Sequence, residues 1–386
     1  MKKHLILVGL AVCAISIVSS CNKGGPSKEY ASDEQKDKLE TTTKTLVSEM
    51  DVDKWSGAIE YTKSVTNYVS SLEENYPGSM DAVYDWMDEN ESDVVALSQM
   101  KGGVFEEVNH KLVFTSNGKS QLELIVYPSG KKASIVMSYG PDGPKYQLPE
   151  EEVRATSPSS TYVQLPSWIK VEVKEGDKTR LSCNTEISVV DKDKNGILDS
   201  EKDEIIVSGT FILDDYTLTV SKMNMNASSN ASVSFVLNKG SKMLMDISYV
   251  AKGGTLADPT SVTLNADFMG SVQIKGDIDS PNFSAAMEDC EDSETEQELK
   301  NAVQRLNKTF NLGLYYDGGN NRQATLSFDV FQETDMTGEW YYSPVFTFGD
   351  GSSQTWDEFM DNEQMRSAVN AISDWMDEVL DYFGLD

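Results

Sequence analysis

The chain has 386 residues, 25% of them charged, and its formal net charge at pH 7 is −30. A surface this acidic repels nucleic-acid phosphates and anionic lipid headgroups, which excludes both as electrostatic partners. The length is sufficient for two or three ordinary domains or for one long β-rich body.

The first 21 residues have the organisation of an export signal. A Lys-Lys pair at positions 2–3 precedes an apolar run, LILVGLAVCAISIV, at residues 5–18. That run is shorter than the roughly 20 residues that a membrane-spanning helix needs. Small residues follow it, so we predict that residues 1–20 are a cleaved signal peptide.

The stretch Val18-Ser19-Ser20-Cys21 resembles the lipobox of bacterial lipoproteins. The resemblance implies that Cys21 becomes the acylated first residue of the mature chain and its only membrane anchor. The alternative is an ordinary signal with an incidental cysteine. Residues 21–32 are polar and contain Gly24, Gly25 and Pro26, which is typical of a flexible tether.

This signal predicts a protein attached by its N-terminal lipid to the bacterial outer membrane. The chain as a whole resembles the acidic, β-rich lipoproteins that are common in the Bacteroidetes. The residues after Cys21, Asn22-Lys23-Gly24-Gly25, lack the acidic residues of the surface-export signal of those bacteria. Both orientations, at the cell surface or facing the periplasm, therefore remain open.

Residues 33–100 form a helical entry segment in which apolar side chains recur every three or four positions. One helix is expected to end before Pro77-Gly78. Its predicted core stripe is Trp55, Ala58, Ile59, Thr62, Val65, Val69 and Leu72. A second helix is expected to bury Met80, Val83, Tyr84 and Met87.

Residues 101–290 change to a period of two, and their short polar connections favour an antiparallel β-meander. Asn117-Gly118 predicts a hairpin between strands around Leu112 and Leu124. Residues 140–160, with four prolines, are expected to be an irregular loop. The predicted inward-facing residues are Ile169, Val171, Val173, Ile187, Val189, Phe211, Leu213, Leu218, Val220, Val233, Phe235, Leu237, Met243, Met245, Ile247, Tyr249, Val262, Leu264, Ala266, Phe268, Val272, Ile274 and Ile278.

Residues 291–386 are expected to contain a helix, three strands and a closing helix. The charged segment 288–298 leads into a helix that carries Leu299, Val303 and Leu306. Strands are predicted around 312–316, 324–331 and 341–348, and a capping box at Thr355–Glu358 starts the last helix. The predicted fold is α+β: a twisted sheet or half-barrel with helices from both chain ends on one face, so that residues 33–386 form one body.

Residues 191–203 resemble an EF-hand-type calcium loop, with oxygen-bearing side chains on alternate residues and Gly196 at the tight turn. Position 12 of the loop is Lys202, so Glu201 or Asp203 would take the place of the usual Glu. The flanks are strand-like, which implies a stabilising Ca²⁺ ion; the alternative is a solvated hairpin turn. The candidate ligands are Asp191, Asp193, Asn195, Ile197, Asp199, Glu201 and Asp203.

Few residues of the mature chain are suited to nucleophilic or zinc chemistry. Cys183 and Cys290 are its only cysteines besides Cys21, and they form either one disulfide or two buried free thiols. His110 is its only histidine, which is too few for an ordinary zinc site and favours no Ser-His-Asp arrangement. We therefore predict that the protein is not an enzyme.

Three functions remain open: a non-enzymatic binding or structural role in the cell envelope, carriage of a hydrophobic acyl ligand, and glycan binding or glycoside hydrolysis by paired carboxylates. Aromatic residues in or beside strands are either sugar-stacking platforms or packing residues. They are Trp168, Tyr315, Tyr316, Trp340, Tyr341 and Tyr342. The oligomeric state is not predicted by the sequence.

Overall fold

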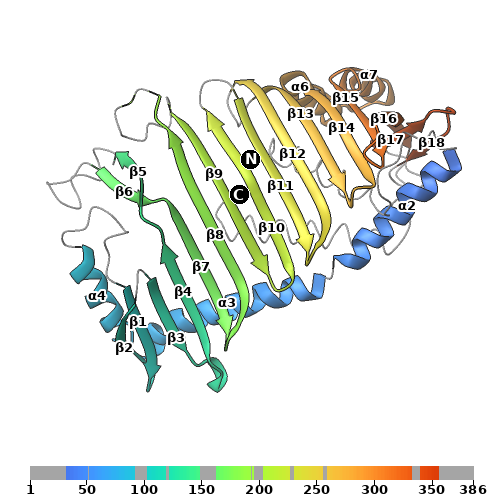
Figure 1. Cartoon of the computed structure of the whole chain (residues 1–386). Helices are drawn as coiled ribbons and strands as arrows, with labels where there is room; N and C mark the ends of the chain where they lie inside the picture. Colours follow the sequence, from blue (N-terminus) through green and yellow to red (C-terminus); the bar gives the residue numbers. More distant parts are fainter. Residues whose placement is uncertain are drawn as a thin grey trace. The chain divides into compact units, whose positions relative to one another are not determined.

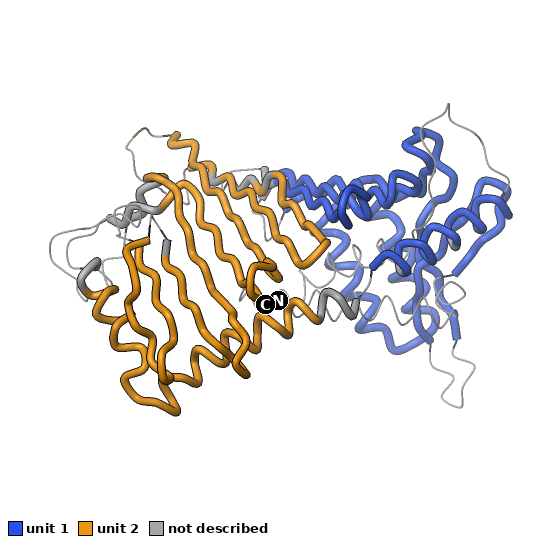
Figure 2. Tube along the Cα trace, turned by 60° about the horizontal axis from the view of Figure 1, so that its bottom comes forward, with its two compact units in different colours: residues 1–52, 229–386 blue, residues 53–228 orange. Residues whose placement is uncertain are grey.

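The computed structural model describes residues 32–50, 52–91, 102–118, 121–147, 162–192, 194, 203–226, 230–254, 259–332 and 340–355. The predicted signal peptide, Cys21, most of the calcium loop and the closing helix lie outside these residues. Contacts divide the chain into two compact units (Figure 2): unit 1 contains residues 1–52 and 229–386, and unit 2 contains residues 53–228.

In its described residues, unit 2 combines two helices with an open mixed sheet (Figure 1). Its strands follow the order β10-β9-β8-β7-β4-β3-β1-β2, and β5 and β6 pair separately. The helices are α3 (Val52–Asn75) and α4 (Asp81–Glu91). The strands are β1 (Gly102–Val108), β2 (Lys111–Gly118), β3 (Gln121–Val126), β4 (Ala133–Tyr139), β5 (Asp142–Gln147), β6 (Tyr162–Pro166), β7 (Trp168–Glu175), β8 (Lys178–Val190), β9 (Glu204–Leu213) and β10 (Tyr216–Asn226).

Helix α3 buries one face against the sheet of unit 2. It ends at Asn75, just before Pro77, as predicted. Its buried Val65 and Leu72 belong to the same hydrophobic cluster as Phe105 on β1 and Val173 on β7. Fully burying a side chain of this size stabilises the fold by about 1.5–3 kcal/mol, so this helical stripe is a main source of the unit's stability.

The predicted buried face of α4 was partly wrong. Val83 and Trp86 are buried, whereas Tyr84 is 50% exposed and Met87 is 38% exposed. The Trp86 indole packs edge-on against Phe105, with ring centroids 5.9 Å apart. Trp86 is the largest apolar side chain of the helix, and its contact with Phe105 favours the orientation in which Trp86 faces the sheet. In this orientation Tyr84 faces solvent.

The predicted hairpin at Asn117-Gly118 does not form. Instead β2 folds back onto β1 through a turn at Asn109 and His110, which both have positive φ. Strand β3 then pairs with the other side of β1 in a parallel register. The sheet is therefore mixed and not a simple antiparallel meander.

The predicted irregular loop at residues 140–160 contains ordered structure at its start. Strand β5 pairs with β6 in a separate two-stranded sheet, although residues 148–161 lie outside the described part. Ser167 donates its backbone N–H to the Pro141 carbonyl at 2.8 Å, which closes this excursion where the chain enters β7. The prolines of this segment do not prevent the short pairing, because a two-stranded ladder does not require a backbone N–H donor at every residue.

The described residues of unit 1 form an antiparallel sheet in the order β18-β17-β16-β15-β14-β13-β12-β11 and three helices. The helices are α2 (Ser32–Glu49), α6 (Ser280–Glu291) and α7 (Glu296–Leu306). The strands are β11 (Asn230–Lys239), β12 (Lys242–Gly254), β13 (Pro259–Phe268), β14 (Val272–Asp279), β15 (Phe310–Tyr316), β16 (Arg322–Gln332), β17 (Trp340–Phe348) and β18 (Ser353–Thr355).

The alternation predicted for the unit 1 strands is confirmed on β13 and β14. Val262, Leu264, Ala266 and Phe268 are all buried on one face of β13. On β11 the pattern fails at Phe235, which is 37% exposed. The three later strands, β15 to β17, form where they were predicted.

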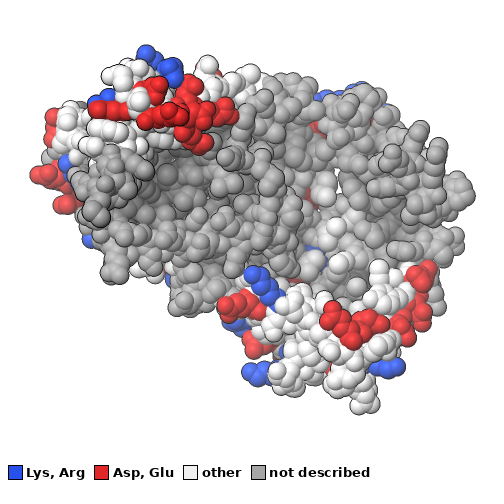
Figure 3. All heavy atoms as spheres, turned by 180° about the vertical axis from the view of Figure 1, so that it is seen from behind, with Lys and Arg blue, Asp and Glu red and all other residues white. Residues whose placement is uncertain are grey.

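The connection between the two short helices of unit 1 is strongly acidic. Seven of the eleven residues from Glu288 to Glu298 are Asp or Glu, and acidic side chains gather on the described surface in Figure 3. Helix α7 begins with a capping box between Thr295 and Glu298. The acidic residues at its start also interact favourably with the positive N-terminal end of the helix dipole.

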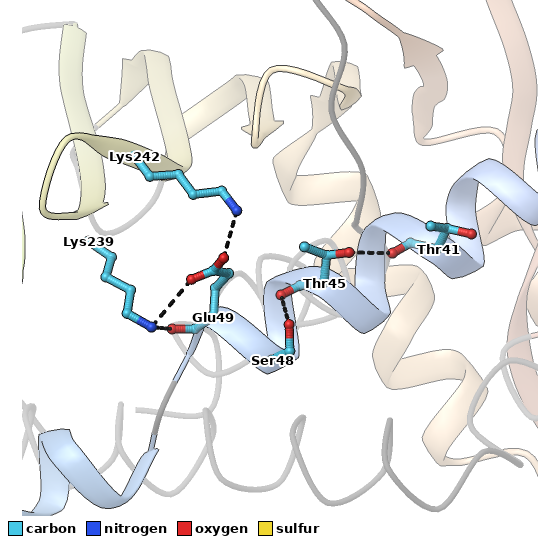
Figure 4. A network of polar contacts seen from close by, with 6 residues as sticks. All are labelled: Thr41, Thr45, Ser48, Glu49, Lys239 and Lys242. Atoms are coloured by element: carbon cyan, nitrogen blue, oxygen red, sulfur yellow. Dashed lines mark hydrogen bonds and ion pairs between the residues drawn. The ribbon is translucent and has the colours of Figure 1, made fainter.

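Helix α2 packs on unit 1 through both apolar and charged contacts. Leu39 and Leu46 are fully buried. At the last turn, Glu49 accepts hydrogen bonds from the ammonium groups of Lys239 at 3.3 Å and Lys242 at 2.8 Å (Figure 4). Lys239 also donates to the Glu49 backbone carbonyl at 2.9 Å, which satisfies one of the orphan carbonyls of the helix end.

No helix among the described residues is long and apolar enough to span a bilayer.

Candidate functional site

A groove of about 520 Å³ lies on one face of strands β7, β8 and β9 in unit 2. Eight of its ten lining residues carry hydrogen-bonding or charged side chains, and only two are apolar or aromatic. The lining residues are Trp168, Lys170, Glu172, Thr179, Ser182, Asn184, Glu186, Thr210, Ile212 and Asp214.

The strand register arranges these side chains in rows across the groove. Glu172 pairs with Ser182, which pairs with Ile212. The next row is Lys170, Asn184 and Thr210, and the row after it begins with Trp168 and Glu186. Directly paired residues share a face of an antiparallel sheet, and successive rows are about 7 Å apart. The floor therefore extends over about 14 Å.

The opposite face of the same strands is the hydrophobic core. Val173 follows Glu172 in the sequence, is buried, and packs in the cluster that contains α3 residue Val65. Because side chains alternate along a strand, the groove lies on the face that turns away from this core. A rigid, packed sheet thus fixes the backbone beneath the polar side chains.

Glu172 is the central charged group of the groove. Its carboxylate contacts Lys170 at 3.0 Å and Lys174 at 3.4 Å. Partial burial by itself raises the pKa of Glu172, but the two ammonium groups outweigh it and hold the pKa below its ordinary value. Glu172 therefore stays ionised at neutral pH and is suited to accepting hydrogen bonds rather than to acting as a general acid.

One end of the groove is fixed by an ionic cluster at the β9–β10 turn. The Asp214 carboxylate contacts the Arg180 guanidinium at 3.2 Å and also pairs with Lys178. The Arg180 guanidinium lies over the Tyr61 ring of α3, 5.6 Å from its centroid. This cluster connects the groove end to the helix on the other side of the sheet.

Trp168 forms the other end of the groove and packs against the backbone at Gly140. A Cβ atom at Gly140 would lie 2.4 Å from the indole Nε1, so only glycine fits beneath the ring. Gly140 also donates its N–H to the Trp168 carbonyl at 2.8 Å. The indole is thus held in one position while it remains only partly buried.

The other aromatic candidates all belong to unit 1. Tyr316 is a core residue whose hydroxyl donates to the Gln35 carbonyl at 2.7 Å. Tyr342 is half-buried, and this burial raises the pKa of its phenol to about 12. Trp340 is 37% exposed with Lys300 over its ring, Tyr341 packs on Phe331, and Tyr315 lies beneath Lys275.

Cys183 and Cys290 are both free thiols in the structure, so the disulfide considered from the sequence is not formed. Cys183 lies on β8 with its Sγ 3.7 Å from the Thr185 hydroxyl. Burial raises the pKa of Cys183, and it raises the pKa of Cys290 to about 11. Both thiols are therefore protonated and weakly nucleophilic at neutral pH.

Of the candidate calcium ligands, the structure describes only Asp191 and Asp203; Asp193, Asn195, Ile197, Asp199 and Glu201 lie outside the described residues. Asp203, immediately before β9, is completely buried, and its carboxylate accepts the Lys192 backbone N–H at 2.9 Å. This bond joins the two ends of the 191–203 segment. Within the described ranges, no group of three or more His, Cys, Asp or Glu side chains could hold a metal ion.

Sequence reasoning identified Trp168 but missed the rest of the groove. Lys170, Glu172 and Asn184 occupy the polar positions of alternating strands, which is the ordinary pattern of a solvated sheet face. One signal was present in the sequence: Lys170 and Glu172 lie two and four residues after Trp168, so the three side chains share one face of β7. Only the register of three strands shows that these side chains lie together.

Comparison of the chain with protein-family models, with curated proteins and with solved structures finds no match.

Proposed function

We propose that the protein is a lipid-anchored, non-enzymatic binding protein of the bacterial cell envelope and that the groove on β7–β9 binds a glycan. The observation that carries this proposal is the arrangement of one fixed indole beside rows of amide, hydroxyl and charged groups. A sugar presents an apolar ring face for stacking and hydroxyl groups that donate and accept hydrogen bonds. The two parts of the groove match these two properties.

The alternative of a carrier for an acyl chain has less support. An acyl chain needs a mostly apolar enclosed cavity, whereas the groove is open and eight of its ten lining residues carry polar or charged side chains. Glycoside hydrolysis also has less support, because a general acid requires a raised pKa and the pKa of Glu172 is lowered.

The test is a binding screen of the full-length protein, solubilised in mild detergent, against neutral and charged oligosaccharides, followed by calorimetry on the sugars that bind. Trp168→Ala and Asn184→Ala are expected to weaken binding at least tenfold, equivalent to about 1.4 kcal/mol. Trp340→Ala is the matched control, since it removes a partly exposed tryptophan outside the groove. Equal affinity in all three variants would contradict the proposal.

We also propose that the 191–203 segment binds a structural Ca²⁺ ion. The burial of Asp203 and its hydrogen bond to Lys192 support a segment whose two ends are held together. Such closure reduces the entropy that a loop loses when its oxygens gather around an ion.

A further inference from the structure

A second set of oxygen-bearing side chains lies in unit 1, on the sheet face opposite the hydrophobic core. Asp246 on β12 pairs directly with Asp267 on β13, and Asp267 pairs directly with Gln273 on β14. Directly opposed residues have Cβ atoms about 4.5–5.5 Å apart. The two carboxylates and the amide can therefore reach one point above the middle strand. Asn265, two residues before Asp267, lies on the same face.

Among the described residues, three buried side-chain oxygens of the β13–β14 hairpin have no hydrogen-bond partner. They are Asn265 Oδ1, Ser271 Oγ and Gln273 Oε1. Gln273 is only 8% exposed, and its Nε2 donates to Asp267 Oδ2 at 2.5 Å, which aims the side chain at that carboxylate. A buried acceptor without a donor is destabilising, so Gln273 Oε1, in the same cross-strand row as Asp246 and Asp267, indicates a missing electropositive partner at this row.

The negative charge of the Asp246–Asp267 pair is not neutralised by an ammonium or guanidinium group in the described part of the chain. Lys275 is the nearest cation in register, opposite Asn265. Its ammonium lies over the Tyr315 ring, 5.1 Å from the centroid, and it forms no ion pair with either carboxylate. Burial, and secondly the Asp267 charge, raise the pKa of Asp246, as expected for opposed carboxylates that lack a cation.

We propose that Asp246, Asp267, Asn265 and Gln273 bind a Ca²⁺ ion on this face of unit 1. All four donors are oxygens, two charged and two neutral, which matches the preference of a hard cation and not that of zinc or copper. Water supplies the remaining ligands of a six- to eight-coordinate ion. With two carboxylates, the affinity belongs to the weak extracellular class, with Kd on the order of 0.1–1 mM.

Calcium titration of the full-length protein tests the site, after removal of metal with a chelator. The titration is made in an Asp191→Ala background, so that the 191–203 segment does not contribute. We expect Asp246→Asn and Gln273→Met to weaken the remaining Ca²⁺ binding at least tenfold. Asp277→Asn is the matched control, because Asp277 lies on the same face of β14 but accepts a hydrogen bond from Thr263.

Thermal unfolding with and without Ca²⁺ separates loss of the site from loss of the fold. Without metal, Asp246→Asn is expected to melt at or above the temperature of its parent, because it removes carboxylate repulsion. With Ca²⁺, the parent and Asp277→Asn gain stability and Asp246→Asn does not. A full calcium-dependent gain in Asp246→Asn, or no Ca²⁺ binding by the Asp191→Ala parent, would overturn the proposal.

Discussion

Glu107 on β1 illustrates how one buried carboxylate organises its surroundings. Its side chain is only 7% exposed. It accepts hydrogen bonds from the Tyr68 hydroxyl at 2.8 Å and the Tyr127 backbone N–H at 2.9 Å. Burial, followed by the bond to Glu107, raises the pKa of Tyr68 to about 12. The carboxylate therefore connects α3, β1 and the end of β3.

Replacing Glu107 with alanine should lower the free energy of unfolding by about 3 kcal/mol, since two donors lose their acceptor in a buried place. Glu107→Gln keeps one acceptor oxygen and should cost about half as much. Urea denaturation at pH 7 measures both. Glu106→Ala is the control, because among the described residues its carboxylate accepts a single hydrogen bond, from the Tyr127 hydroxyl. A similar loss in Glu106→Ala and Glu107→Ala would argue against a special role for Glu107.

At the scale of the element, the C-terminal end of α2 is attached by Glu49 to the β11–β12 turn. The hydrogen bonds from Lys242 and Lys239 lower the pKa of Glu49 below its ordinary 4.5. A carboxyl group with a lowered folded-state pKa stabilises the fold above its unfolded pKa, and the contribution is lost as the pH falls through the folded value.

Glu49→Gln should therefore lower the free energy of unfolding by about 1 kcal/mol at pH 7, the usual size for a partly exposed ion pair. The difference from the parent should shrink as the pH falls through the lowered pKa of Glu49, because the parent carboxyl then becomes protonated too. Chemical denaturation at several pH values measures this. A difference that is constant with pH would show that the lost contribution is packing and not charge.

The turn between β1 and β2 shows why local motifs predicted the wrong hairpin. Asn117-Gly118 has the better turn sequence, yet Asn109 and His110 form the turn, with φ of 50° and 63°. The His110 ring stacks on Tyr76 at 4.1 Å and its Nδ1 lies 3.5 Å from Glu107. These contacts come from residues outside the turn, so they outweigh the local preference and are not visible in the dipeptide.

Asn109→Val should accordingly destabilise the protein by about 1–2 kcal/mol, because a β-branched residue is strained in the left-handed region. Asn117→Val should have little effect or stabilise slightly, since Asn117 is exposed within strand β2, where valine is favoured. Melting temperatures of the two variants make the comparison. The reverse ranking would favour the hairpin predicted from the sequence.

The proposed calcium segment is also an element with a direct test. Ca²⁺ should raise the melting temperature of the parent protein, and Asp191→Ala should lose part of that rise, because binding to the folded state alone stabilises it by mass action. Lys192→Ala is the control, since the hydrogen bond to Asp203 comes from the Lys192 backbone N–H, which alanine retains. Equal responses to chelator in the parent and Asp191→Ala would favour the solvated turn instead.

At the scale of the whole molecule, alternation predicted which residues form strands but not how the strands are ordered. A period of two is a local property of a one-sided sheet, and it was sufficient for β13 to β17. The position of β1 between β2 and β3, and the pairing of β4 with β7 past β5 and β6, depend on contacts between distant residues. The groove was not predictable for the same reason, because its rows exist only through the register of β7, β8 and β9.

The membrane attachment proposed for the whole protein depends on Cys21. Each CH₂ group of an attached acyl chain that enters the bilayer adds about 0.8 kcal/mol of membrane affinity. An acidic protein surface does not supply such affinity by itself. Cys21→Ser should therefore move the protein from the membrane pellet to the soluble fraction and abolish incorporation of labelled fatty acid. Cys13→Ser is the matched control, because it changes a cysteine within the apolar run of the signal and leaves the lipobox intact. If Cys21→Ser stayed in the pellet and Cys13→Ser behaved identically, the attachment would have to come from a surface of the folded chain.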